Sequence, residues 1–146
     1  MNEQTFVVLM AEDSEHDIIA TRRAWRKESI PHPLYIVTDG EQCLDYLYRN
    51  GSYSDPKFSP RPGLLLLDIN MPKMSGLEVL KKLRADKTFC DLPVVMLTTS
   101  KAEQDRMGSY ILGANAFITK PIGFENFSAA LKHISNFWSL AGTAGG

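Results

Sequence analysis

Four consecutive leucines, Leu64–Leu67, constrain the fold of this chain more than any other stretch. A strand with one face in water alternates apolar and polar residues, and this run does not. The run therefore predicts a strand covered on both faces, as in a parallel sheet between helices. Asp68 follows directly, and ligands bind at the carboxyl ends of the strands in such sheets. We expect Asp68 to be a carboxylate at the mouth of a binding crevice.

Four other apolar runs of strand length alternate with helical patterns along the chain. This alternation is typical of α/β proteins, in which a parallel sheet lies between two layers of helices. Right-handed crossovers leave few topologies, and we predict a flavodoxin-like, doubly wound (βα)5 fold with strand order 2-1-3-4-5. The predicted strands are Thr5–Ala11, Leu34–Thr38, Leu64–Leu67, Leu92–Leu97 and Asn115–Ile118, and the predicted helices are 14–29, 39–49, 75–85, 100–112 and 124–140.

Short polar side chains mark the starts of these helices. Ser75 and Glu78 have the spacing of a capping box, and Ser14 with Asp17 resembles one. Asp39 is placed to cap the second helix.

The chain length fits one domain, residues 1–146, with a sizeable core. Residues 51–62 contain one glycine, three prolines and several serines, so we predict a surface loop insertion there. Residues 141–146 are small and predict a flexible tail.

The composition excludes several classes of function. The net charge is −1 with both signs mixed, and no basic stripe indicates a nucleic-acid partner. No apolar run is long enough for a membrane span, and residues 1–11 lack the features of a signal peptide. We therefore expect a cytoplasmic protein that contacts no membrane. Cys43 and Cys90 have no CxxC spacing and are interpreted as reduced packing residues, with a disulfide as the less favoured alternative.

Polar side chains follow four of the predicted strands. Glu12 and Asp13 follow the first strand, Asp68 the third, Thr98 the fourth and Lys120 the fifth. These four strands are neighbours in the predicted order, and parallel strands end at the same edge of the sheet. We expect three carboxylates, a hydroxyl and an ammonium group to converge there.

This set of groups suits phosphoryl transfer. Clustered carboxylates repel one another unless a cation lies among them, and oxygen ligands that leave room for water suit Mg²⁺. A carboxylate nucleophile accepts a phosphoryl group in aspartyl-phosphate enzymes. A metal ion and a lysine neutralise the phosphoryl oxygens, and a threonine hydroxyl donates a hydrogen bond to them.

With these residues in view, the sequence resembles the receiver domain of response regulators in two-component signalling. The resemblance extends from Phe6 to about Leu140. It rests on the acidic pair Glu12–Asp13 and on the segments "LLLLDINMPKMSG", "PVVMLTTS" and "FITKP".

The resemblance implies a phospho-acceptor and a metal site. Asp68 would accept the phosphoryl group. Asp13 and Asp68 would ligate Mg²⁺ directly, Asn70 would contribute its backbone carbonyl, and Glu12 would act through water.

The resemblance also implies phosphate-binding and switch residues. Thr98 and Lys120 would bind the phosphoryl group, with Thr99 lining the same site. Phe117 occupies the position of the switch aromatic, where tyrosine is common, so its switching would depend on packing alone. The bond between Lys120 and Pro121 is expected to be cis, as X–Pro bonds permit.

The implied function is to take a phosphoryl group from a sensor histidine kinase and lose it later to water. The chain ends after the fifth predicted helix, so we expect no DNA-binding output domain. The signal would pass to a downstream protein, or to a second copy through the fourth helix, fifth strand and fifth helix. The insertion "GSYSDPKFSPRP" and the terminal "NFW" resemble stand-alone receivers that serve bacterial phytochrome kinases. Such a receiver catalyses its own phosphorylation and is not a conventional turnover enzyme.

Three alternatives belong to other classes. A pseudo-receiver would only bind partners, although all the pocket residues are present here. A Mg²⁺-dependent phosphatase would need a second acid two residues after the nucleophile, where this chain has Asn70. A flavodoxin would need a phosphate-binding loop after the first strand, and the acidic "AEDSEHD" would repel the flavin phosphate.

Overall fold

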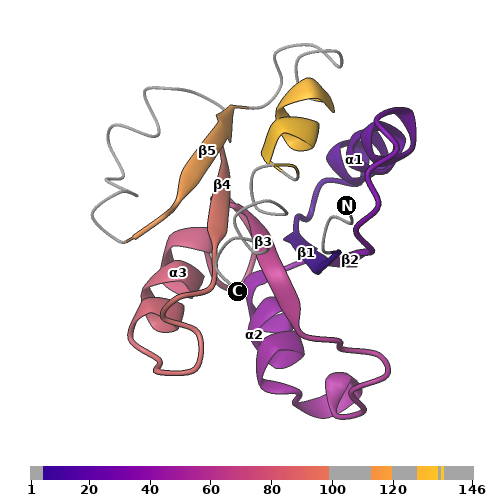
Figure 1. Ribbon diagram of the computed structural model, residues 1–146. Helices are drawn as coiled ribbons and strands as arrows, with labels where there is room; N and C mark the ends of the chain where they lie inside the picture. The colour runs from indigo at the N-terminus through magenta and orange to yellow at the C-terminus, as the bar shows by residue number, and fades with distance from the viewer. Residues whose placement is uncertain (1–4, 99–112, 120–127, 135, 137–146) are drawn as a thin grey trace.

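A five-stranded parallel sheet with the strand order β2-β1-β3-β4-β5 is the centre of the molecule (Figure 1). The computed structural model describes residues 5–98, 113–119, 128–134 and 136. The predicted flavodoxin-like order is confirmed. The strands are β1 (Val7–Ala11), β2 (Leu34–Val37), β3 (Pro62–Asp68), β4 (Val94–Thr98) and β5 (Ala116–Thr119), and the helices are α1 (Glu15–Lys27), α2 (Gly40–Tyr48), α3 (Gly76–Arg84) and the short 3₁₀ helix η1 (Gly51–Tyr53).

A hydrophobic layer covers each face of the sheet, and the leucines of β3 contribute alternately to the two layers. Leu65 and Leu67 pack into the layer that contains α2 and α3. Leu64 and Leu66 pack into the layer that contains α1 and the helical residues 128–134. Figure 1 shows these helices on opposite sides of the sheet. All four leucines are at most 1% exposed, as expected for a strand buried on both faces.

The boundary of β3 differs from the prediction. Proline and glycine favoured a loop through residue 62, but the strand begins at Pro62, which pairs with Val7 before a shift of register. Proline has no N–H to donate to the ladder, which disfavours it inside a strand. At the first position of a strand this missing donor is tolerated.

The predicted helix caps form. The Ser14 hydroxyl accepts a hydrogen bond from the Asp17 N–H, and an Asp39 carboxylate oxygen accepts one from the Gln42 N–H at 2.8 Å. Ser75 and Glu78 make both hydrogen bonds of a capping box. Two helices end near their predicted limits. Helix α2 stops at Tyr48 because Arg49 adopts a left-handed conformation, and α1 stops at Lys27, two residues before the predicted end at a left-handed Ser29.

The predicted surface loop is anchored to α2. The Tyr46 hydroxyl donates a hydrogen bond to the Pro60 carbonyl at 2.7 Å, and the Arg49 guanidinium donates two to the Ser59 carbonyl. The buried Ser59 hydroxyl in turn donates to the Tyr53 carbonyl at 2.8 Å. The loop therefore has a defined conformation on the surface, with the Phe58 side chain exposed.

Several predictions lie outside the described residues. These are the helix over 100–112, the two ends of the last helix and the tail over 141–146. Within the last predicted helix, residues 128–134 are helical. Among the helices that the structure describes, none has the length and hydropathy to cross a membrane. Cys43 and Cys90 are both free thiols, as predicted.

Candidate functional site

Three carboxylates meet at the carboxyl ends of β1 and β3. The ligand oxygens of Glu12, Asp13 and Asp68 lie within 4.8 Å of one another. The two strands are paired, with Ala11 opposite Leu67, so the residues that follow them emerge side by side. The three carboxylates that strand order predicted to converge therefore do meet in the structure.

Two of the three carboxylates are buried. Glu12 is 1% exposed and Asp68 is 4% exposed, whereas Asp13 faces solvent. The Glu12 Oε2 atom accepts a hydrogen bond from the Ser14 N–H at 3.2 Å, which orients this side chain at the start of α1. Burying neighbouring negative charges is unfavourable unless a cation or hydrogen bonds compensate them. A buried set of oxygen donors with one solvent-facing member fits a hard, partly hydrated divalent ion such as Mg²⁺.

Gly76 holds the loop after Asp68 close to the end of β3. Its N–H donates to the Ile69 carbonyl at 2.9 Å. A Cβ atom at this position would lie 2.1 Å from the Asp68 carbonyl oxygen, so only glycine fits without a shift of the backbone. Gly76 belongs to the segment "LLLLDINMPKMSG", but sequence reasoning predicted no role for it. A glycine directly after the helix cap Ser75 was the feature that could have indicated a close backbone contact.

A second contact joins the same loop to the start of α2. Lys73 lies in the loop with a positive φ of 69°, and its Nζ atom is 3.8 Å from Oδ2 of Asp39. Asp39 is the buried N-cap of α2. Sequence reasoning assigned Asp39 only the capping role and gave Lys73 none, because spacing along the chain does not show that the two meet.

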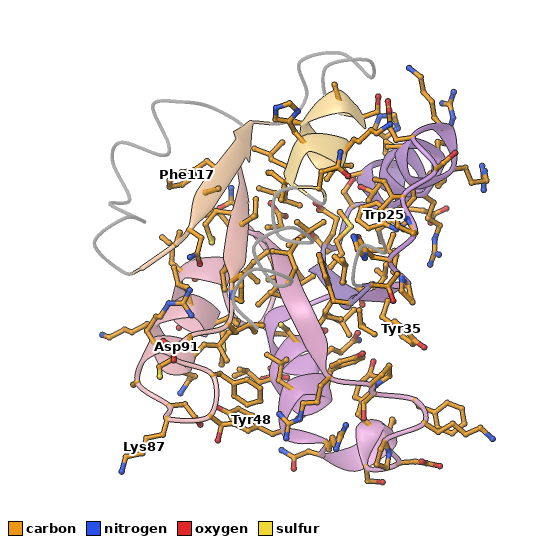
Figure 2. The ribbon with its side chains drawn as sticks, viewed as in Figure 1. Trp25, Tyr35, Tyr48, Lys87, Asp91 and Phe117 are labelled. Atoms are coloured by element: carbon orange, nitrogen blue, oxygen red, sulfur yellow. The ribbon has the colours of Figure 1, made fainter. Side chains whose placement is uncertain are left out.

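The remaining predicted site residues lie on β4, on β5 or outside the described part of the chain. β4 pairs with β3, with Leu97 opposite Asp68, and Thr98 is its last residue. Phe117 on β5 is half-buried and packs against the hydrophobic layer of α2 and α3 (Figure 2). Thr99, Lys120 and Pro121 lie outside the described residues, so the predicted phosphate contacts and the cis bond are not described here.

A sequence model of the response regulator receiver domain matches residues 8–132. The chain belongs to the response regulator receiver family. Receiver domains act in two-component signalling and are phosphorylated on an aspartate, which agrees with the acidic cluster at the end of β3.

The receiver domain is similar to several response regulators, two of which are described as proteins of red light signaling or of a phytochrome. It is 36% identical to response regulator Rcp1 of Synechocystis sp. over 90% of this chain and 88% of that protein. The structure of a response regulator in red light signaling of R. palustris matches with a TM-score of 0.83 and 36% identity, over 92% of both chains. The phosphorylated cyanobacterial phytochrome response regulator RcpA matches with a TM-score of 0.81 and 36% identity, over 92% of this chain and 94% of that one. The structure of Rcp1 that also matches is a Mn²⁺-bound form.

Proposed function

We propose that this receiver domain takes a phosphoryl group from a phosphohistidine of a sensor histidine kinase onto Asp68. The observation that carries the proposal is the buried position of Asp68 beside Glu12 and Asp13 at the carboxyl edge of the sheet. A strand and the adjacent glycine hold Asp68 in one place, which is the positioning that phosphoryl transfer needs.

The chemistry assigned to Asp68 is nucleophilic. One of its carboxylate oxygens attacks phosphorus and forms a P–O bond, while the P–N bond to the kinase imidazole breaks. Water later attacks the aspartyl phosphate, releases inorganic phosphate and restores the carboxylate. Both steps occur on the same side chain, so the chain carries a signal and is not a conventional turnover enzyme.

The proposed ligands of Mg²⁺ are Asp13, Asp68 and the Asn70 backbone carbonyl, with Glu12 acting through water. When bound, the ion would neutralise the carboxylate and phosphoryl oxygens. The Mn²⁺-bound form of a relative that is 36% identical supports binding of a divalent metal by this receiver domain.

Thr98, Thr99 and Lys120 are proposed to bind the phosphoryl oxygens. A shift of Thr98 toward the phosphate would change the packing around Phe117, which lies on the neighbouring strand. This movement would bias two existing arrangements of the surface formed by the fourth predicted helix, β5 and the last helix. A downstream protein or a second copy of the chain would then bind that surface.

The proposed phosphodonor is a kinase of the phytochrome type. Support comes from the relatives, since RcpA is described as a phytochrome response regulator and the R. palustris protein acts in red light signaling.

The test measures incorporation of ³²P from acetyl phosphate or from a phosphorylated kinase, with and without Mg²⁺. We expect label in the wild type only with Mg²⁺, and none above background in Asp68→Asn. Asp91→Asn is the matched control, because Asp91 is an exposed carboxylate in the loop before β4, away from the carboxyl edge (Figure 2). Equal labelling of the wild type and Asp68→Asn would refute the proposal. An unlabelled wild type would favour a pseudo-receiver, and turnover of small phosphate esters would favour a phosphatase.

A further inference from the structure

An ion pair outside the carboxylate cluster joins the loop between β3 and α3 to the start of α2. Lys73 Nζ lies 3.8 Å from Asp39 Oδ2. The Lys73 side chain is 60% exposed, whereas the Asp39 side chain is 7% exposed, so only the carboxylate partner is shielded from water. Lys73 also adopts a left-handed backbone conformation, which is unfavourable for a residue with a side chain. An unfavourable conformation at this position is evidence that the surrounding contacts determine it.

Asp39 is well placed to hold the loop because its two carboxylate oxygens have different partners. Oδ1 accepts the hydrogen bond from the Gln42 N–H that caps α2. Oδ2 is the atom that faces Lys73. The carboxylate is therefore fixed to the helix by one oxygen and offers the other to the loop.

The backbone of the loop also touches α2 directly. A Cβ atom on Gly40 would lie 2.3 Å from the Met74 carbonyl oxygen and 2.7 Å from the Met74 Cβ atom. Gly40 is the first residue of α2, directly after Asp39. The loop thus meets α2 at two adjacent points, through Lys73 and through Met74.

The other side of the loop is closed on β3. Gly76 lies against the Asp68 carbonyl and donates its N–H to Ile69. The segment from Asn70 to Gly76 is therefore held between the end of β3 and the start of α2. Asn70 lies in this segment, and its backbone carbonyl is the ligand that the proposed function assigns to the metal.

We propose that Lys73 and Asp39 are positioning residues for the metal site, and that their ion pair keeps the loop in the conformation that presents the Asn70 carbonyl. This inference rests on the proposed function, because it is about the same metal site. Neither residue is assigned as a ligand. Their effect on Mg²⁺ passes through the backbone of the loop.

A purely electrostatic role for Lys73 predicts the opposite result. Lys73 carries a positive charge on the loop that follows Asp68, so its removal would strengthen Mg²⁺ binding if charge alone mattered. If the ion pair positions the loop, its removal weakens Mg²⁺ binding despite the more negative site. The direction of the change therefore separates the two roles.

The experiment measures the Kd of Mg²⁺ by isothermal titration calorimetry in the wild type and in Lys73→Met. We expect Kd to rise several-fold. Mutating a direct hydrogen-bond partner of a metal ligand lowers metal affinity by about 10–100-fold, and a more distant residue should have a smaller effect. Lys87→Met is the matched control, because Lys87 is an exposed lysine between α3 and β4, at the opposite edge of the sheet (Figure 2). It removes the same charge and is expected to leave Kd within about twofold, since screening weakens distant charges.

Two further variants keep the test decisive if Lys73→Met perturbs the loop in another way. Lys73→Asn removes the charge with a residue that tolerates the left-handed conformation, and we expect it to weaken binding as well. Asp39→Asn removes the ion pair but keeps a good helix cap. For the double variant Lys73→Met/Asp39→Asn we expect a Kd of Mg²⁺ about equal to that of the weaker-binding single variant, because both changes break the same ion pair. If the two charges acted independently, their opposite effects would cancel and Kd would return to the wild-type value.

The outcomes distinguish this inference from the proposed function. A wild type that binds no Mg²⁺ would refute the positioning role together with the metal site of the proposed function. A wild type that binds Mg²⁺ and accepts phosphate, with Lys73→Met and Lys73→Asn binding Mg²⁺ as tightly or more tightly, would refute only the positioning role. Urea unfolding of each variant, measured in parallel without Mg²⁺, checks that weaker binding does not come from a loss of folded protein.

Discussion

At the scale of single residues, two glycines allow chain segments to pack closely beside the site. Gly76 approaches the Asp68 carbonyl, and Gly40 approaches Met74. Each glycine leaves room for a main-chain segment that a Cβ atom would displace. The position of the proposed phospho-acceptor therefore depends on neighbours that have no chemistry of their own.

Gly76→Ala should destabilise the protein and disturb the site together. The added Cβ atom would lie 2.1 Å from the Asp68 carbonyl oxygen, and neither backbone segment is free to move without breaking the Gly76–Ile69 hydrogen bond. We expect a loss of about 2–3 kcal/mol of unfolding free energy, the upper part of the range for overpacked sites. Urea unfolding measures it.

The control for this variant is Gly51→Ala. Gly51 has a positive φ of 56° but open space around it, so only the left-handed conformation opposes a side chain there, at about 1 kcal/mol. If the two variants unfold at the same free energy, close contact with Asp68 is not what requires glycine at residue 76.

Sequence reasoning recovered the residues that strand ends deliver and missed those that meet only in three dimensions. Asp68, Glu12 and Asp13 were placed together because parallel strands of known order end at one edge. The ion pair between Lys73 and Asp39 joins the loop after β3 to the N-cap of α2, and no spacing along the chain indicates that these two residues touch. The same limitation applies to the close approach of Gly76.

At the scale of elements, the predicted helix caps and strand order were correct. The loops between elements make side-chain hydrogen bonds that the sequence did not predict. The loop over 51–62 was predicted from its prolines and glycine as a surface insertion. Its anchors are Tyr46 in α2 and Arg49 directly after that helix, and both look like ordinary helical positions in the sequence. Loop conformation depended on side chains of a neighbouring helix, which turn propensities do not contain.

Arg84 makes a similar connection at the end of α3. Its guanidinium donates to the Gly113 carbonyl at 3.0 Å, to the Phe89 carbonyl at 3.3 Å and to Asn115 Oδ1 at 3.1 Å. The Asn115 Oδ1 atom also accepts a hydrogen bond from the Val94 N–H. The Asn115 side chain, directly before β5, therefore links Arg84 of α3 to the start of β4. Burial lowers the pKa of Arg84 from its ordinary value, in line with partial removal of the guanidinium from water.

Arg84→Lys should destabilise the domain although it keeps the charge. Lysine has no planar set of donors and cannot reach three acceptors in these directions. We expect a loss of about 2 kcal/mol in unfolding free energy, the magnitude of one or two hydrogen bonds from a charged donor. Lys82→Met on the exposed face of α3 is the control and should change stability by less than about 0.5 kcal/mol. Equal effects would mean that the Arg84 hydrogen bonds contribute little.

At the scale of the whole molecule, the fold brings negative charges together at one edge of the sheet, although the sequence as a whole mixes both signs. The net charge is only −1, yet three carboxylates lie within 4.8 Å of one another. The topology creates this imbalance, since β1 and β3 are adjacent and parallel. Folding therefore brings Asp68 against the acidic pair Glu12–Asp13, which is far from it along the chain, at the site where the metal is proposed to bind.

Magnesium should therefore stabilise the folded protein, and the carboxylates should be responsible. A ligand that binds only the folded state adds about 2.7 kcal/mol at a free concentration of 100 times its Kd. We expect the urea midpoint to rise with Mg²⁺ in the wild type and to respond little in Asp68→Asn. In EDTA, Asp68→Asn should be more stable than the wild type, because one of the repelling charges is removed while the side-chain shape is kept. Asp91→Asn, which removes an exposed charge elsewhere, should keep the wild-type response to Mg²⁺. A wild-type midpoint that is the same in Mg²⁺ and in EDTA would show that the carboxylate cluster is compensated without a divalent ion, and the metal site would then be wrong even if Asp68 accepts phosphate.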